Sequence, residues 1–282
     1  MKKVIAFLLV FVLALSFVAC GNDDTSDTSS APVSEPAASE AESEAESEEE
    51  SKEEVVVMTH EEFIAADIDS KVVIETYVQA KQSHYVGNQN AGGQDTAVVY
   101  AQSEDGGYLL YDMPCTAEEY EALVPGTKIR VTGYKAEFNG EIEIAEAEFE
   151  ILEGSFIAQP VDVTDKLGTD ELVNYQNSLV AFLGMTVEAS KDADGNDVAF
   201  LYKWNGSGAD GDDLYFNVSK DGKTYTFTVE SYLCDKDSDV YKAVKALNVG
   251  DTIDLAGFLY WYEAAQPHIV GVAPSADAEC VG

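Results

Sequence analysis

Hydrophobic residues in the region 55–274 fall into short runs rich in Val, Ile, Tyr and Phe, and turn residues separate these runs. That pattern predicts strands rather than long helices. Two stretches, 98–113 and 214–229, each contain two such runs joined by an Asp-Gly pair, at Asp105 and Asp221. Because an Asp-Gly pair between apolar runs is a strong turn signal, each stretch predicts a β-hairpin.

Each predicted hairpin lies between a long apolar strand and a short helix. The long strands are predicted at 72–80 and 179–189, and the helices that follow the hairpins at 117–123 and 240–247, with Asp239 as the N-cap of the second. Short amphipathic helices are also predicted to begin near Thr59 and Thr169. Thr59 and Glu62 have the spacing of a capping box, which satisfies two backbone N–H groups at a helix start.

The chain contains an internal repeat. Residues 123–134 align with residues 247–258, so that Leu, Gly, Ile, an aliphatic residue, Gly and an aromatic residue recur at one offset. Gly126 and Gly250 are predicted to occupy tight turns. Gly133 and Gly257 lie inside predicted strands, where glycine often marks a bulge or a barrel corner. A last strand is predicted at 141–152 in the first copy and at 268–272 in the second.

The order in each copy is long strand, hairpin, helix, strand and final strand, which resembles the OB-fold. The resemblance implies a mainly β fold with two tandem OB-fold-like five-stranded Greek-key barrels, each with a short helix between strands 3 and 4. We expect the barrels at 55–158 and 159–274, followed by a flexible tail at 275–282. Segments 133–137 and 258–262 are similar to segments of uncharacterised lipoproteins of anaerobic Firmicutes. This similarity says nothing about an activity.

The amino-terminal residues predict export. Lys2 and Lys3 precede an apolar run at 4–15, which is too short to span a membrane and ends shortly before Cys20. The region resembles a bacterial lipoprotein lipobox, with Phe17 where leucine is commonest. The resemblance implies a signal peptide at 1–19 and a lipid on Cys20, hence a protein anchored on the extracytoplasmic side of the cell membrane. An ordinary secretory signal is the alternative.

Residues 20–54 form a predicted tether. Nearly all of them from residue 22 onward are Asp, Glu, Ser, Thr, Ala or Pro, without aromatic residues or apolar periodicity. Such a segment cannot bury enough surface to offset the entropy of ordering, and its like charges extend it. We therefore expect a disordered acidic spacer between the membrane and the folded region.

The charge of the chain argues against nucleic acid as a partner. The formal net charge is −37, and Arg130 is the only arginine. Nucleic-acid binding draws most of its affinity from Lys and Arg side chains that neutralise phosphates. The expected partners are the membrane, through the lipid anchor, and an envelope protein or an oligosaccharide, with no nucleic acid.

Aromatic residues in the second copy are the candidate binding residues. Trp and Tyr rings can stack on sugars or anchor a partner's side chains. Leu259 and Trp261 are predicted on one face of a strand at 254–262, with Tyr260 and Tyr262 on the other, so one face must lie at a surface or an interface. Trp204, Trp261 and Tyr262 are predicted to make the contact. Packing within and between the barrels is the competing explanation.

Two Asp-rich loops predict at most a weak calcium site. The ligands would be Asp192, Asp194, Asn196 and Asp197, although the spacing fits no EF-hand. Asp-Gly clusters also form ordinary turns. No other cofactor is expected.

No catalytic residue is predicted. The histidines His60, His84 and His268 are isolated in sequence, and no glycine-rich phosphate loop or Gly-x-Ser-x-Gly motif occurs. Cys115 and Cys234 are expected to be free thiols. The sequence thus predicts a ligand- or protein-binding module at the cell envelope rather than an enzyme. An envelope hydrolase acting on wall glycan or peptide, and a structural partner subunit of an envelope complex, are the alternatives.

Overall fold

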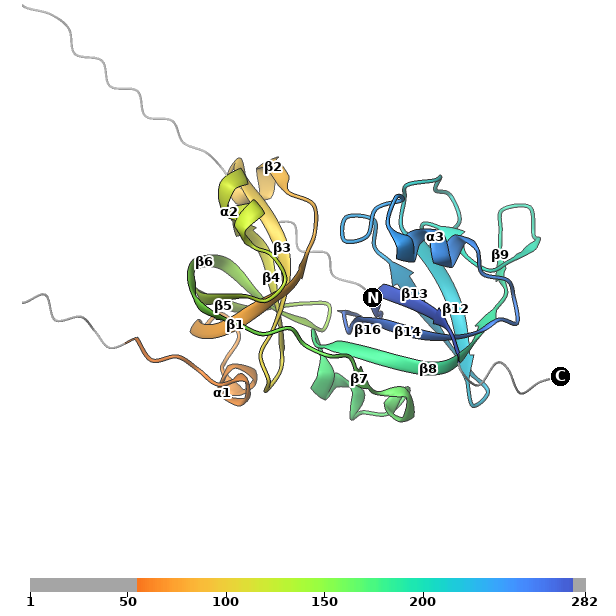
Figure 1. The fold of residues 1–282 in the computed structure, drawn as a ribbon, viewed down its shortest axis with the longest axis horizontal. Helices are drawn as coiled ribbons and strands as arrows, with labels where there is room; N and C mark the ends of the chain where they lie inside the picture. The colour runs from red at the N-terminus through yellow and green to blue at the C-terminus, as the bar shows by residue number, and fades with distance from the viewer. Residues whose placement is uncertain (1–54, 276–282) are drawn as a thin grey trace, which may run out of the picture. The chain divides into compact units, whose positions relative to one another are not determined.

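The computed structural model describes residues 55–275, in which β-strands predominate (Figure 1). The predicted signal peptide, Cys20, the whole of the predicted tether and all of the predicted tail except Ser275 lie outside these residues. No helix among the described residues is long and apolar enough to cross a membrane.

The first sheet has six strands, five of which close into a barrel. Its strands are β1 (Lys71–Lys81), β2 (Tyr85–Asn88), β3 (Gln94–Gln102), β4 (Gly107–Pro114), β5 (Thr127–Phe138) and β6 (Glu141–Ser155). They pair in the order β1-β5-β6-β4-β3-β2, and an additional β1–β3 pairing closes the barrel without β2. β4 and β6 run parallel, and the other pairs are antiparallel. This order, with α2 (Ala117–Ala122) between β4 and β5, is that of an OB-fold, which confirms the predicted fold class at this level.

Local sequence explains the short helices of this half. α1 (His60–Ala65) begins with the predicted capping box of Thr59 and Glu62, and Phe63 is its buried residue. α2 begins with a second capping box, formed by Thr116 and Glu119. A 3-10 turn, η1 (Gln89–Ala91), joins β2 to β3.

The second sheet repeats the strand order of the first. Its elements are β7 (Val161–Asp162), η2 (Thr164–Lys166), η3 (Leu172–Tyr175), β8 (Leu179–Glu188), β11 (Leu201–Tyr202), β12 (Leu214–Lys220), β13 (Lys223–Val229), α3 (Asp239–Lys245), β14 (Thr252–Phe258) and β17 (His268–Pro274). The pairing order is β11-β12-β13-β17-β14-β8-β7, with an additional β12–β8 pairing and a parallel β13–β17 pair. Two small hairpins extend from it, β9 (Ser190–Lys191) with β10 (Asp197–Val198) and β15 (Trp261–Tyr262) with β16 (Ala264–Ala265). Figure 1 shows α3 covering one end of this sheet.

The repeated glycines behave as predicted. Gly126 and Gly250 have φ values of +93° and +94°, which favour glycine in a turn. The strand register shifts beside Gly133 and at Gly257. A Cβ on Gly257 would lie 2.5 Å from the backbone oxygen of His268, so the strands can approach there only without a side chain.

Three sequence predictions in the second half need correction. Ser238, not Asp239, is the N-cap of α3, and its hydroxyl accepts the N–H of Tyr241. No α-helix begins at Thr169, where the described chain forms only the 3-10 turns η2 and η3. The predicted strand at 254–262 is interrupted, because β14 ends at Phe258 and the chain turns before β15.

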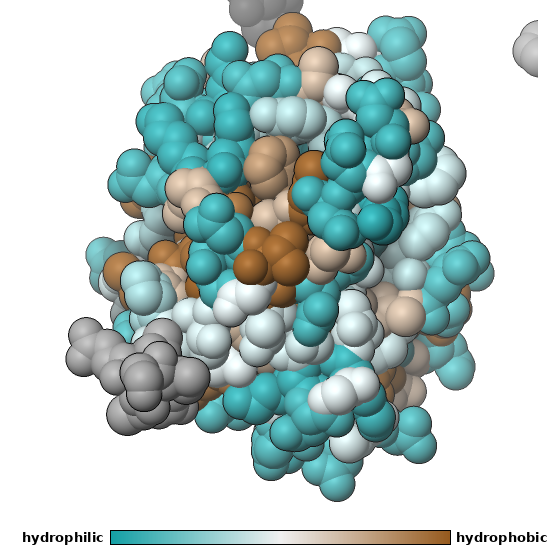
Figure 2. Space-filling view, turned by 90° about the vertical axis from the view of Figure 1, so that its right-hand side faces the viewer, coloured by the Kyte–Doolittle hydropathy of each residue, from teal (hydrophilic) through white to brown (hydrophobic). Residues whose placement is uncertain are grey.

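Each sheet has its own apolar core, and a smaller cluster joins the two. Tyr100, Leu109 and Phe258 form this third cluster, with Tyr260 among the residues packed against it. The face presented in Figure 2 is mainly hydrophilic around a smaller apolar area. Apolar burial is therefore concentrated inside the sheets and where they meet.

Candidate ligand-binding cavity

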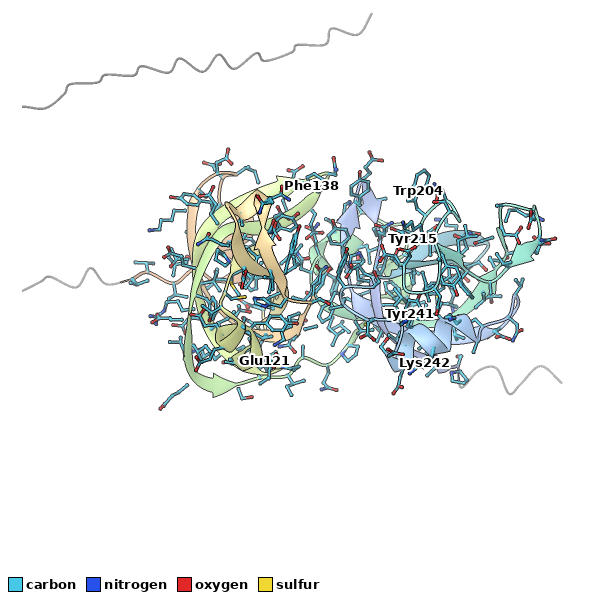
Figure 3. The ribbon with its side chains drawn as sticks, turned by 90° about the horizontal axis from the view of Figure 1, so that it is seen from above. Glu121, Phe138, Trp204, Tyr215, Tyr241 and Lys242 are labelled. Atoms are coloured by element: carbon cyan, nitrogen blue, oxygen red, sulfur yellow. The ribbon has the colours of Figure 1, made fainter. Side chains whose placement is uncertain are left out.

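A cavity of about 600 Å³ lies where the outer face of β3 and β4 meets the second sheet. Its size suits a small organic ligand or a few sugar rings. Its lining is mainly aromatic, with two carboxylates: Gln82, Val98, Tyr100, Leu109, Tyr111, Trp204, Asp213, Tyr215, Glu230, Tyr260, Tyr262, Gln266 and His268. Figure 3 labels Trp204 and Tyr215 on the side that the second sheet contributes.

Stacked rings build one wall of the cavity. The rings of Tyr100 and Phe258 are stacked with centroids 4.4 Å apart, and those of Tyr260 and His268 with centroids 4.3 Å apart. The Tyr100 hydroxyl lies 2.9 Å from Nδ1 of His268. Burial lowers the pKa of His268 to about 3, so this imidazole is neutral at physiological pH. It serves as a hydrogen-bonding and stacking group rather than a positive charge.

A second set of contacts fixes the same junction. The N–H of Trp261 donates to Oε2 of Glu141 over 2.7 Å, and Nε2 of Gln176 donates to the carbonyl of Gly140 over 2.8 Å. Nδ2 of Asn177 donates to the carbonyl of Ile142 over 2.8 Å. These bonds join the β5–β6 turn and the start of β6 to the segment before β8 and to β15.

The structure brings together two of the three predicted binding residues. Trp204 is 73% exposed and Tyr262 is 46% exposed, and both line the cavity. Trp261 does not line it. That side chain packs against the second apolar core, and Cδ1 of its ring would lie 2.9 Å from a Cβ placed on Gly140. One face of the segment 254–262 was predicted to lie at a surface or an interface, and Phe258 of this segment packs where the two sheets meet.

Two carboxylates that sequence reasoning missed, Asp213 and Glu230, face the aromatic rings. Oδ1 of Asp213 accepts hydrogen bonds from the N–H and the hydroxyl of Ser231, at 2.9 and 2.7 Å. Glu230 accepts the N–H groups of Tyr232 and Leu233. Burial, helped by the charge of Asp213, raises the pKa of Glu230 to about 7. The signal available in the sequence was one acidic residue at each end of the aromatic-rich hairpin 214–229.

The predicted calcium loop is a hairpin turn between β9 and β10. Oδ1 of Asp192 accepts the N–H groups of Asp194 and Asn196, and its Oδ2 accepts from Nδ2 of Asn196. Asp197 forms an ion pair with Lys191 at 2.7 Å. Within residues 55–275, no group of three or more His, Cys, Asp or Glu side chains is placed to hold a metal ion.

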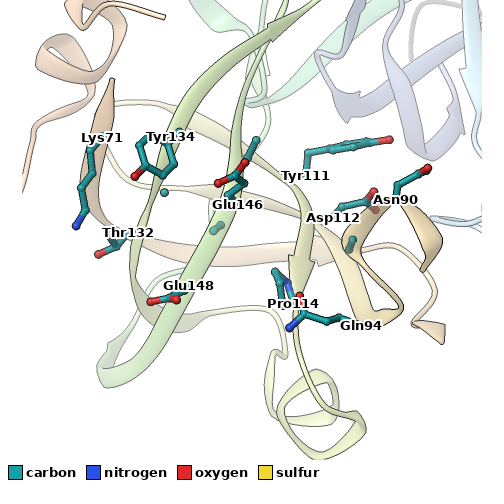
Figure 4. A pocket seen from close by; sticks show the side chains of 14 residues that line it. Lys71, Asn90, Gln94, Tyr111, Asp112, Pro114, Thr132, Tyr134, Glu146 and Glu148 are labelled. Carbon is teal, nitrogen blue, oxygen red and sulfur yellow. The ribbon is translucent and has the colours of Figure 1, made fainter. Parts of the chain in front are cut away.

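A larger hollow of about 690 Å³ lies on the first sheet, where β4 and β6 separate (Figure 4). Lys71, Tyr111, Asp112, Tyr134 and Glu146 are among its lining residues. Asp112 and Glu146 have φ values of +46° and +49°, so both strands bulge there. It shares Tyr111 with the cavity between the sheets but has no predicted binding residue.

The remaining sequence candidates are structural. Cys115 and Cys234 are free cysteines among the described residues, and burial raises the pKa of each to about 11. His60 lies against Tyr108 with centroids 5.2 Å apart, and His84 stacks on Tyr120 at 4.9 Å. His60 also contacts Phe63, so these two histidines pack against aromatic rings of their own surroundings.

Comparisons with known proteins find likenesses only among solved structures, since no protein-family model and no curated protein matches the chain. A murine DNA-binding protein bound with double-stranded DNA is 12% identical, with a TM-score of 0.36, over 72% of this chain and 99% of that chain. The Ifi202 HINa domain in complex with double-stranded DNA is 10% identical, with a TM-score of 0.34, over 72% and 98%. A replication protein A heterotrimer bound to single-stranded DNA is 9% identical, with a TM-score of 0.27, over 79% and 70%.

These likenesses correct one prediction. The predicted exclusion of nucleic acid as a partner is withdrawn, because it conflicts with the similar structures, which are bound to DNA. The physical reason is that net charge sums over the whole chain, whereas binding depends on the local potential and the stacking rings of one face. The value of −37 therefore does not decide the question. At these identities and TM-scores, the likeness assigns no ligand to this chain.

Proposed function

We propose that the chain is an extracytoplasmic lipoprotein of the cell envelope, in which two tandem OB-fold-like domains bind a ligand in the cavity between them. The observation that carries the proposal is the aromatic cavity, to which both sheets contribute. The second strand order, which repeats the first, supports the tandem arrangement. The lipobox residues that end at Cys20 support the membrane anchor.

The aromatic rings favour binding over a purely structural role. Trp204 is the most exposed aromatic residue of the lining, and Tyr111 and Tyr262 are also exposed. Large exposed rings around a preformed hollow are typical of surfaces that contact a ligand, because the rings lose little entropy on binding and bury much apolar area. A residue needed only for packing would be buried, as Phe258 is.

Thermal shift of the full chain tests the binding proposal. The panel contains wall-derived oligosaccharides, peptides, calcium with a chelator control, and a single-stranded oligonucleotide. A ligand that binds only the folded state raises the melting temperature, and Trp204→Ala and Tyr262→Ala should abolish that rise. Tyr134→Ala, which removes a similarly exposed ring from β5 outside the cavity, should leave it intact. A rise that survives both cavity substitutions contradicts the proposal.

The membrane anchor has its own test. Cells that express the full chain are labelled with palmitate, and the label should be lost in Cys20→Ser while the chain is still exported. Label that persists in Cys20→Ser, or a wild-type chain without label, contradicts the lipoprotein assignment. The binding proposal does not depend on this result.

A hydrolase is the second candidate, and one observation favours it. Glu230 has a pKa raised to about 7 and lies near Asp213 in the same aromatic cavity. One protonated and one ionised carboxyl group is the arrangement that glycosidases use as acid and nucleophile or base. Release of reducing ends from wall glycan, lost in both Glu230→Gln and Asp213→Asn, would establish this activity. Absence of release from wall glycan and wall peptide rejects it.

A further inference from the structure

The charges inside the cavity point to the chemical class of its ligand, an inference that rests on the proposed function. Asp213 and Glu230 line the cavity, and among the described residues no lysine or arginine does. His268, the only histidine of the lining, is neutral because burial lowers its pKa to about 3. The ionisable side chains of the cavity therefore supply negative charge alone at physiological pH.

Two lysines of the second half of the chain pair with carboxylates that do not line the cavity. Lys203 precedes Trp204 in the chain, but its Nζ pairs with Asp212 at 3.6 Å. Lys245 pairs with Asp210 at 2.5 Å. Among the described residues, the hydrogen bonds to the carboxylates of Asp213 and Glu230 come from Ser231, Tyr232 and Leu233, all uncharged groups. Hydrogen bonds orient these carboxylates without supplying a countercharge.

Aromatic rings provide the second part of an ammonium site. Trp204, Tyr111 and Tyr262 are exposed rings of the lining, and Tyr215 and Tyr260 are half-buried. The negative face of an aromatic ring attracts a cation, and cages of such rings recognise quaternary ammonium groups. Rings alone would serve a neutral sugar equally well. Rings with uncompensated carboxylates favour a positive charge.

We propose that the cavity selects a small organic cation, a ligand that carries an ammonium group. Its volume of about 600 Å³ fits such a molecule and is far larger than a bare metal ion needs. The ammonium group lies among the rings near Asp213 and Glu230, and the ligand supplies the countercharge that the cavity lacks. Anionic and neutral ligands of the same shape bind more weakly.

Calorimetric titration of the full chain with choline and with 3,3-dimethyl-1-butanol tests the charge directly, because these probes have nearly the same shape and differ in the positive charge. We expect choline to bind about tenfold more tightly, because the aromatic rings and the nearby carboxylate both attract its positive charge. Asp213→Asn should remove most of this preference. Asp221→Asn removes the same charge from the β12–β13 turn, outside the cavity, and should not change it.

The outcomes separate this inference from the proposed function. Equal affinity for the two probes overturns the cation selectivity, and so does a preference for choline that Asp213→Asn leaves unchanged. If a neutral oligosaccharide binds in a Trp204-dependent manner while choline does not bind, the cation inference fails and the binding function stands. If choline binds and Trp204→Ala does not weaken it, the cation inference fails, because the cation then lies outside this cavity, and the thermal-shift panel decides the binding function separately.

Discussion

Glu141 offers a sharp test of how the two sheets are joined. Its Oε2 accepts hydrogen bonds from the N–H of Trp261 and from Nε2 of Gln176, at 2.7 and 3.2 Å. Its buried Oε1 has no hydrogen-bond partner among the described residues, and neither has the buried Oδ1 of the adjacent Asn177. Burial raises the pKa of Glu141 to about 8. The carboxyl group is therefore mainly protonated at pH 7.

The size of the effect follows from proton linkage. The pKa of Glu141 rises from 4.5 to about 8 on folding, so between these values the folded state holds one more proton than the unfolded state. The contribution to stability is complete below pH 4.5 and is lost as the pH rises to about 8, at about 1.4 kcal/mol per pH unit. Integrated from pH 5 to pH 7, the loss is about 2.5 kcal/mol. Glu141→Gln mimics the neutral form and cannot titrate.

Urea unfolding of the wild type and Glu141→Gln at pH 5, 6, 7 and 8 measures this difference. The stability of Glu141→Gln relative to the wild type should increase by about 2.5 kcal/mol from pH 5 to pH 7. Glu148→Gln changes an exposed glutamate of the same strand, β6, and should give a much flatter difference. Curves for the wild type and Glu141→Gln that remain parallel over this range would refute the reasoning.

Three further predictions concern the cavity and the junction. Trp204→Ala should abolish ligand binding but change the free energy of unfolding by less than about 0.5 kcal/mol, because the side chain is 73% exposed. Binding titrations and urea unfolding of this variant measure the two effects. Choline affinity should rise from pH 6 to pH 8 as Glu230, with a pKa of about 7 beside Asp213, becomes charged, and calorimetry should find that Glu230→Gln flattens the rise. Gly140→Ala should lower the free energy of unfolding by about 1–3 kcal/mol, because φ is +89° and the new Cβ would lie 2.9 Å from the Trp261 ring. Gly222→Ala is the control, because φ is +76° there but the added Cβ meets open space, and it should lower the melting temperature less.

Local signals made the order of strands predictable. Asp-Gly turns, capping residues and repeated glycines act within a few residues of their own position, so a single sequence contains them. The capping box at Thr116 and Glu119 has the same form as that at Thr59 and Glu62 and could have been predicted in the same way. The N-cap of α3 was misplaced by one residue because Ser238 and Asp239 are both good caps.

The cavity was only half predictable because it depends on contacts between distant segments. The aromatic content of the second copy identified Trp204 and Tyr262, but Tyr111 comes from β4 of the other sheet. Trp261 was assigned to the site because strand alternation was extended through Leu259, where the chain turns instead. Alternation predicts a face only while the strand continues.

A crystal structure of the full chain with choline tests the central claim most directly, because it locates the ligand. We predict choline in the cavity between the sheets, with its ammonium group against Trp204 and Tyr262 and within reach of Asp213. Choline bound elsewhere on the chain, or an empty cavity at a saturating choline concentration, would contradict the account.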